Sequence, residues 1–267
     1  MMLINKNFKW ENYMKVLSKI KMIFAATAVA SVMLPTASIA ADHGNHSSKG
    51  MDVPGIGSMV IMSGLKNPWD MAFTKSGDMF FTEKCDGLSV KTASGVTKLY
   101  GMKGSKGYGA AGSDLFCEGQ AGMLGVTLDP KFESNRTLYL YSTSNKYHGD
   151  GCKTNFERCD GNIVMKFKVA KDLSKVSGRK DIVKDIQYKP FKSDQPFGGP
   201  GAHNGGRMAF GPDGFLYVGT GDRHRGICGQ DNSLLCSVVL RIDGNGKGAS
   251  GNKVKGDKRI YLSLIHI

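Results

Sequence analysis

The sequence predicts an all-β fold built from repeated antiparallel hairpins. Glycine is abundant, at 36 of 267 residues against only 8 prolines, and the glycines separate short apolar runs. Three strand–turn–strand units also recur, each with two runs rich in apolar, aromatic or β-branched residues. Because 40% of the residues are hydrophobic and 22% are charged, the composition is that of an ordinary globular protein.

The three units have the same internal order of strand, turn and strand. Phe73, Leu128 and Phe210 hold matching positions in them, 55 and 82 residues apart. The units lie at residues 69–83, 123–142 and 207–219, and further strands are expected at 88–90, 96–100 and 162–169.

Residues 172–185 give the only hint of a helix, but we expect a loop there, because Ser174, Ser177 and Gly178 interrupt the segment. Hairpins repeated at roughly 40 to 50 residues are typical of a β-propeller, whose blades are four-stranded antiparallel sheets. A β-sandwich is the alternative architecture.

Residues 1–40 are predicted to be an export signal, with the start at Met1 or Met14. Lysines precede an apolar run at 23–34, and small residues follow it at 38–40. That run is shorter than the roughly 20 residues a spanning helix needs, so we expect no membrane span after cleavage; an uncleaved anchor is the alternative. Residues 41–55 are expected to be a flexible leader, and the protein to be periplasmic or secreted.

Six cysteines fall into three local groups, which suggests disulfides in an exported chain. The candidates are Cys85 with Cys117, Cys152 with Cys159, and Cys228 with Cys236. A zinc site is the alternative, but no Cys-x-x-Cys pair occurs. We assign no metal-ligating residue.

The formal net charge is +13, but the lysines are dispersed rather than clustered. A basic surface of this kind favours solubility and anionic partners. It lacks the aromatic interleaving of a nucleic-acid surface, so we expect no nucleic-acid partner.

His203 lies in the segment Gly-Ala-His-Asn-Gly-Gly-Arg at 201–207, directly before an apolar strand. The glycines allow backbone or ligand to approach the imidazole closely. Histidine accepts a proton near neutral pH, so the segment suggests a catalytic base. A turn histidine bonded to backbone is the alternative. His224 and Arg225, farther along, are expected in a solvated loop, with a place at the rim of a pocket as the alternative.

Four segments together resemble the pyrroloquinoline-quinone (PQQ)-dependent soluble sugar dehydrogenases, the glucose/sorbosone dehydrogenase family. The resemblance runs from about residue 64 to 261. Its segments are Asn-Pro-Trp-Asp-Met-Ala-Phe at 67–73 with Phe-Thr-Glu-Lys at 81–84; Glu-Gly-Gln-Ala-Gly-Met-Leu-Gly at 118–125; the His203 segment with Gly-Thr-Gly-Asp at 219–222; and Gln-Asp at 230–231 with Val-Leu-Arg-Ile-Asp at 239–243.

The resemblance implies a six-bladed propeller that carries the quinone over its central channel, with residues 56–261 as its N-terminal part. It implies PQQ and Ca²⁺ as cofactors, and oxidation of the C1 hydroxyl of an aldose sugar to the lactone. A quinone or cytochrome would then accept the electrons. His203 matches the general base, and Gln120 matches a glutamine beside sugar and quinone. Arg207 and Asp222 match motif positions expected to brace the hairpin.

The chain departs from the family pattern in two places. Ala202 stands where the soluble glucose dehydrogenases carry an aspartate, so His203 either has another partner or is a weaker base. Residues 262–267 fit no family pattern, and we expect a truncated chain that holds about half of the blades. The arginines, the lysine and the calcium ligands around the quinone would then lie in later blades.

Two other functions fit the same repeats. A non-enzymatic binding propeller, similar to the hedgehog-interacting protein, would suit the cysteine pairs and Ala202. A lactonase-like propeller would need a metal in its channel, for which no converging carboxylates and asparagines can be picked out.

The truncation leads to a prediction about the isolated 267-residue chain. We expect that it neither binds the quinone tightly nor oxidises sugar, because the cofactor residues of the later blades are absent from it. Aldose oxidation by the purified chain with PQQ and Ca²⁺ would contradict this expectation.

Overall fold

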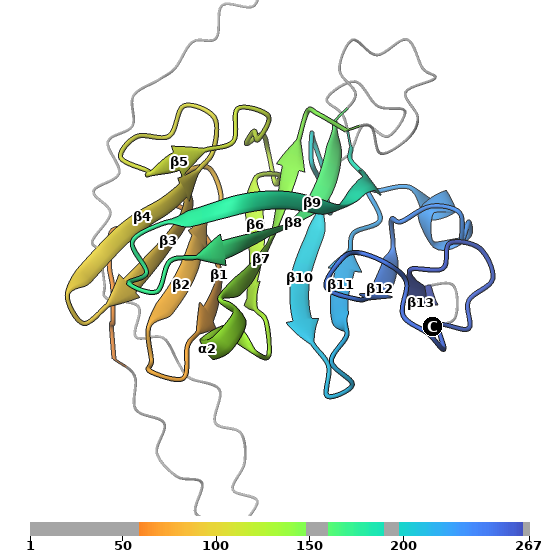
Figure 1. The fold of residues 1–267 in the computed structure, drawn as a ribbon. Coiled ribbons are helices and arrows are strands. Elements are labelled where there is room, and N and C mark those ends of the chain that lie inside the picture. The colour runs from red at the N-terminus through yellow and green to blue at the C-terminus, as the bar shows by residue number, and fades with distance from the viewer. Residues whose placement is uncertain (1–58, 148–159, 190–197, 264–267) are drawn as a thin grey trace, which may run out of the picture. The chain divides into compact units, whose positions relative to one another are not determined.

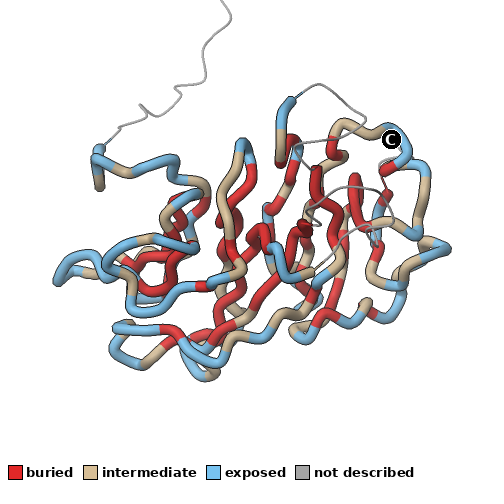
Figure 2. Tube along the Cα trace, turned by 90° about the horizontal axis from the view of Figure 1, so that it is seen from above, coloured by how far each residue is buried: buried red, intermediate tan, exposed pale blue. Residues whose placement is uncertain are grey.

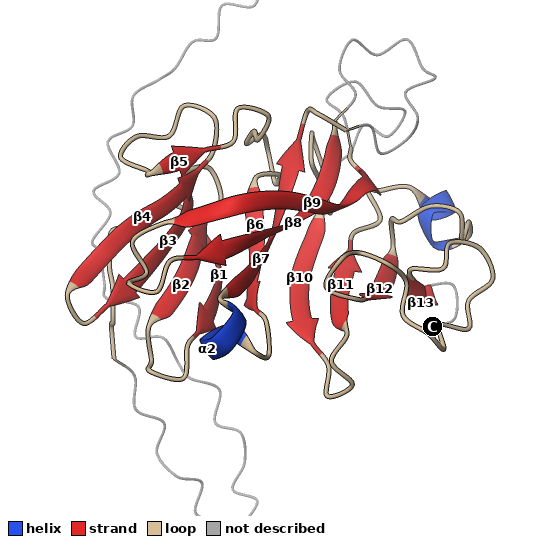
Figure 3. Cartoon of the chain, in the orientation of Figure 1, coloured by secondary structure: helices blue, strands red, loops and turns tan. Residues whose placement is uncertain are grey.

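The computed structural model describes residues 59–147, 160–189 and 198–263, which form three antiparallel sheets (Figure 1). The predicted signal, the leader and the Cys152–Cys159 pair lie outside the described residues. Strands dominate, and the described helices are only α2 (Phe132–Asn135) and the 3-10 turn η1 (Gly226–Gly229) (Figure 3). Neither is long enough to cross a membrane, and no described helix meets that requirement.

Each sheet contains a four-stranded antiparallel meander whose strands follow one another in chain order, as in a propeller blade. The first blade contains β1 (Pro68–Phe73), β2 (Met79–Glu83), β3 (Gly87–Thr92) and β4 (Gly95–Gly101), with β5 (Ala110–Ala111) added in parallel at its edge. The second contains β6 (Met123–Leu128), β7 (Thr137–Ser144), β8 (Gly161–Val169) and β9 (Val176–Gln187). The third contains β10 (Gly205–Phe210), β11 (Leu216–Thr220), β12 (Val238–Ile242) and β13 (Ile260–Ser263). The predicted all-β propeller is therefore confirmed, with three blades in the described residues.

The three predicted hairpin units are the first two strands of the three blades. Phe73 pairs with Met79, Leu128 with Leu138, and Phe210 with Leu216, each at the turn end of its hairpin. The matching positions in the sequence are thus equivalent positions in the blades.

The predicted loop at residues 172–185 is wrong for most of its length, because β9 begins at Val176. Val176, Val183 and Ile186 are buried and hold the strand against its neighbours. Ser177 and Gly178, which suggested a loop, lie where the register between β8 and β9 shifts. The burial of these apolar side chains thus outweighs the preference of the serines and the glycine for a loop.

The first strands β1, β6 and β10 lie beside one another, so the blades meet face to face (Figure 1). One apolar core packs between the first and second blades and another between the second and third. Every residue of β7, in the middle blade, is buried. Figure 2 shows that buried stretches lie in the interior, whereas exposed stretches lie mainly in the peripheral loops. A sheet covered on both faces loses the alternation of a half-exposed strand.

One buried carboxylate joins all three first strands. Asp70 of β1 accepts a hydrogen bond from the backbone N–H of Val126 in β6, at 3.1 Å, and forms an ion pair with Arg207 of β10. Gly125 makes this approach possible, because a Cβ there would collide with the carbonyl oxygen of Gly206. Asp70 therefore fixes how the inner strands sit against one another.

Two of the three predicted cysteine pairs are disulfides in the structure. Cys85–Cys117 ties the β2–β3 turn to the segment before β6. Cys228–Cys236 closes the loop that contains η1. Both bonds brace loops at the strand ends where β1, β6 and β10 begin.

Replacing Asp70 with alanine is expected to destabilise the fold by about 1–3 kcal/mol, because the buried Val126 N–H loses its acceptor. Asp70→Asn keeps an acceptor oxygen and should cost less. The urea midpoint of unfolding measures both changes. Asp172→Ala serves as the control, with a smaller expected change, because this carboxylate is exposed and water can replace it as the acceptor of the two bonds from Ser174. Equal effects of Asp70→Ala and Asp172→Ala would contradict the role of Asp70.

Candidate active site

A pocket of about 720 Å³ opens where β1, β6 and β10 begin, at the meeting point of the three blades. Its walls combine an indole ring, two cationic side chains, amides and an imidazole. The lining residues are Asn67, Pro68, Trp69, Lys84, Gln120, Leu124, His203, Asn204, Gly205, Arg207 and Gly219.

The backbone presents His203 at the mouth of this pocket, just before β10. Its φ of 50° lies in the left-handed region, and Gly205, two residues later, also has a positive φ. The backbone N–H of His203 donates to Oε1 of Gln120 at 3.0 Å. The structure thus brings together two of the residues that the sequence singled out.

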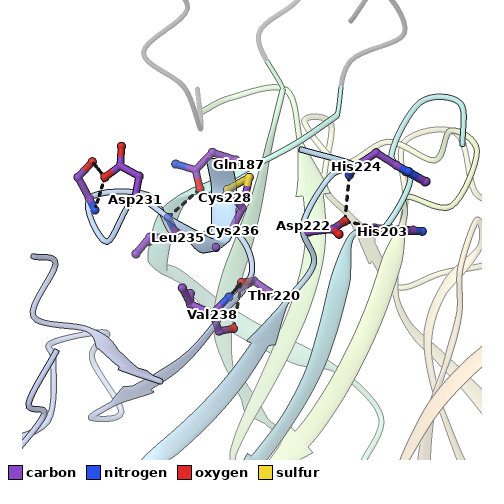
Figure 4. The surroundings of a disulfide bond; sticks show 12 residues. Gln187, His203, Thr220, Asp222, His224, Cys228, Asp231, Leu235, Cys236 and Val238 are labelled. Atoms are coloured by element: carbon purple, nitrogen blue, oxygen red, sulfur yellow. Dashed lines mark hydrogen bonds and ion pairs between the residues drawn. A yellow bond between two sulfur atoms is a disulfide. The ribbon is translucent and has the colours of Figure 1, made fainter. Parts of the chain in front are cut away.

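The imidazole of His203 has a carboxylate partner from the neighbouring strand. Its Nδ1 lies 2.7 Å from Oδ1 of Asp222, which follows β11 (Figure 4). The two strand ends can approach this closely because Gly221 has no side chain: a Cβ there would collide with the carbonyl of His203. Ala202, the residue before His203, is fully buried and apolar, so the carboxylate beside the imidazole is that of Asp222.

Two hydrogen bonds, from the backbone of His224 and the side chain of His203, act on Asp222. Burial raises its pKa, but the N–H of His224, which donates at 2.9 Å, and the side chain of His203 outweigh that effect and hold the pKa below its ordinary value. Asp222 is therefore ionised at neutral pH and can only accept. It follows that Nδ1 of His203 carries the proton in this bond, which leaves the lone pair of a neutral ring on Nε2.

His224 belongs to the site, which differs from the solvated loop expected for it. Its ring stacks on that of His203, with centroids 3.8 Å apart and planes inclined by 26°. The positive φ values of Arg223 and His224 turn the loop back over His203. This contact depends on a loop conformation that the sequence pattern does not reveal.

Two cations lie along the pocket wall. The guanidinium of Arg207 is 5.5 Å from the centre of the Trp69 ring and pairs with Asp70, while its side chain stays 70% exposed. The ammonium of Lys84 donates to the carbonyl of Gly119. Both cations remain accessible to an anionic ligand.

Asn204 is a buried polar residue of the pocket wall. Its Oδ1 accepts from Nδ2 of Asn162 at 2.9 Å, and its carbonyl accepts from the hydroxyl of Tyr141 at 2.9 Å. Its own Nδ2 is buried with no acceptor among the described residues. A buried donor without an acceptor suits a ligand or water oxygen.

Sequence reasoning missed Trp69, Lys84 and Asn204 as pocket residues, although all three lie inside the segments that carry the family resemblance. Each lies at the strand ends that border the pocket: Trp69 at the start of β1, Lys84 just after β2 and Asn204 just before β10. That position in the hairpin could have indicated a pocket residue. No group of three or more His, Cys, Asp or Glu residues converges on a metal position in the described residues.

Comparison with known proteins gives a consistent result. The sequence model of the Glucose / Sorbosone dehydrogenase family matches residues 65–264. The chain is 26% identical over 191 residues to aldose sugar dehydrogenase YliI of Escherichia coli, covering 70% of this chain and 44% of that protein. It is 25% identical over 217 residues to the uncharacterized protein slr1608 of Synechocystis, covering 77% and 47%.

Solved structures show the same fold. The PQQ-bound aldose sugar dehydrogenase of Streptomyces coelicolor superposes with a TM-score of 0.57 at 23% identity, over 76% of this chain and 52% of that one. The apo form of the Escherichia coli soluble aldose sugar dehydrogenase gives 0.55 at 25%, over 74% and 50%. The chain spans about half the length of the curated relatives it matches.

The partners of Asp222 predict its titration. In the native protein its pKa should lie below the ordinary value of about 3.9, and His203→Gln should raise it. Since the folded pKa is lowered, the stability that Asp222 contributes is present above the ordinary pKa and is lost as the pH falls through the folded pKa. Carboxyl-carbon NMR measures the pKa directly.

Asp231 provides an internal control for that titration. Hydrogen bonds from Ser233 lower its pKa, and burial opposes them only in part. Its pKa should therefore stay unchanged in His203→Gln. An Asp222 pKa that does not move in this variant would show that the two side chains do not interact.

Proposed function

Because the chain belongs to the glucose / sorbosone dehydrogenase family, we propose that the whole product of its gene oxidises the C1 hydroxyl of an aldose sugar to the lactone with PQQ as cofactor. The observation that carries the proposal is the His203–Asp222 pair at the mouth of the pocket, at 2.7 Å. An imidazole held in this way is a suitable general base for a sugar hydroxyl.

The pocket suits a quinone that bears several carboxylates. Lys84 and Arg207 supply positive charge, the ring of Trp69 offers a flat surface, and Asn204 has a buried donor without an acceptor among the described residues. We include Ca²⁺ as the ion that accompanies the quinone in the family. No described residue is assigned to it.

The protein's own residues bind, orient and deprotonate the sugar. When bound, the quinone supplies the acceptor for the hydride that leaves C1. Nε2 of His203 takes the hydroxyl proton, while Asp222 holds Nδ1 and stabilises the resulting imidazolium. Oε1 of Gln120 is bonded to the His203 N–H, so its amide nitrogen is the group that can donate to a sugar hydroxyl.

We further propose that the protein is exported and acts in the periplasm or outside the cell. The two disulfides fit an oxidising compartment, and the predicted signal at residues 1–40 fits export. A quinone or a cytochrome would then take the electrons from the reduced cofactor. The proposed partners are a small sugar and this acceptor.

The test is PQQ-dependent aldose oxidation by the whole product of the gene that encodes this chain. His203→Gln should lower kcat/KM by about 10²- to 10⁴-fold, the usual contribution of a general base. Asp222→Asn should also lower it, because an amide cannot stabilise the imidazolium. Asp231→Asn changes a carboxylate in the next loop, outside the pocket, and should have little effect.

Two results would contradict the proposal. Activity of His203→Gln within about threefold of the native protein would remove His203 as the base. No oxidation of any aldose by the native protein, with PQQ and Ca²⁺ present, would favour the non-enzymatic binding propeller. The two disulfides support that alternative, because they suit a cysteine-rich binding propeller.

A further inference from the structure

A second pocket, of about 430 Å³, lies at the opposite ends of the strands from the His203 pocket. It is bounded by the second blade and by the turn after β12. The His203 pocket adjoins the start of β6, whereas this pocket adjoins Asp129, just past its end. The lining residues are Asp129, Thr137, Tyr139, Lys166, Phe167, Lys168, Gly178, Lys180, Gly244 and Asn245.

Three lysines lie together in this pocket. Lys166 and Lys168 stand two residues apart on β8, so they share a face of the sheet. Lys180 of β9 is the cross-strand partner of Lys166. Like charges placed directly opposite each other on a sheet are destabilising.

Neutral oxygens are the acceptors that the structure provides for these lysines. Nζ of Lys166 donates to the carbonyl of Gly244 at 2.8 Å and to Oδ1 of Asn245 at 2.5 Å. Nζ of Lys168 donates to the carbonyl of Asn135 at 2.6 Å and to Oγ1 of Thr137 at 2.8 Å. Lys180 has no hydrogen-bond acceptor or carboxylate partner within the described part of the chain.

The two nearby carboxylates are already occupied by local bonds. Asp129 accepts from the side chain of Asn135 at 2.8 Å and from the hydroxyl of Tyr139 at 3.3 Å. Asp243 accepts the backbone N–H groups of Asn245 and Lys247 in its own turn. These bonds do not cancel the effect of the carboxylates on the lysines, but two carboxylates offset three ammonium groups only in part.

The electrostatics of Lys166 reflect this imbalance. Burial lowers its pKa, the charges of Lys180 and Lys168 lower it further, and Asp243 and Asp129 offset only part of the shift. An anion beside the ammonium would favour its charged form. Such a ligand would relieve the repulsion among the three lysines.

We propose that this pocket binds an oxyanion of the phosphate or sulfate type, free or carried on a small sugar. Lys180 is its principal cationic contact, with Lys166 and Lys168 beside it. The hydroxyl of Thr137 and the amide nitrogen of Asn245 also line the pocket and can donate hydrogen bonds to the oxygens of such a ligand. The site is separate from the proposed sugar oxidation and does not depend on it.

Isothermal titration calorimetry at constant ionic strength tests the proposal, with inorganic phosphate and glucose 6-phosphate as probes. Inorganic phosphate is expected to bind this pocket at one site per chain. Glucose is titrated in parallel, so that sugar binding in the His203 pocket is distinguished from binding of glucose 6-phosphate here. Lys180→Gln should weaken binding of both phosphate probes about tenfold, the usual scale for one charge-assisted hydrogen bond. Lys166→Gln/Lys180→Gln should weaken them more. Glucose itself should show no loss of binding in these variants.

The control is Lys253→Gln/Lys255→Gln, which removes two exposed lysines from the loop before β13. It lowers the net charge as much as the double variant does, and should change affinity less than about twofold. Lys166 bridges two blades, so the double variant could fail to fold. The single variant Lys180→Gln then still tests the proposal, because Lys180 makes no such bridge among the described residues. No saturable binding of either probe, or equal weakening in the control and in Lys180→Gln, would overturn the proposal.

Discussion

The hydrogen bonds and the ion pair of Asp70 are the interactions on which the arrangement of this protein depends. One buried carboxylate contacts the first strands of three consecutive blades, through the N–H of Val126 and the guanidinium of Arg207. A buried charge is tolerated only when it is paired and hydrogen-bonded, so the register of these strands is tightly constrained. The His203 pocket opens where these strands begin, and its shape follows from this constraint.

Two further features shape the pocket: a close contact between β10 and β11, and a disulfide in the loop after β11. Glycines at positions 205 and 221 let the ends of β10 and β11 come together, which places Asp222 against Nδ1 of His203. The disulfide Cys228–Cys236 closes the loop that follows Asp222 and His224 (Figure 4). The position of His203 thus depends on the loops after β11, which the disulfide holds, as well as on the strands.

Much of the fold can be predicted from the sequence, because repeated hairpins leave a regular pattern of apolar runs and turns. The equivalence of Phe73, Leu128 and Phe210 follows from that pattern alone, and their strand pairings confirm it. The strand β9 does not follow from it, since its polar and small residues resemble a loop and only burial against the blade keeps it extended. The partner of His203 is hidden for a different reason. Position 202 is the local place to seek a carboxylate, whereas Asp222 lies 19 residues along the chain and reaches the imidazole only through the fold.

The central inference is that Asp222 fixes the tautomer of His203 and so leaves Nε2 as the base. Nitrogen-15 NMR of the His203 ring, at a pH where the ring is neutral, measures this directly. We predict that Nδ1 carries the proton and that Nε2 shows the resonance of an unprotonated nitrogen. A ring with the proton on Nε2 would contradict the assignment, because that nitrogen could not then accept a proton from a sugar hydroxyl.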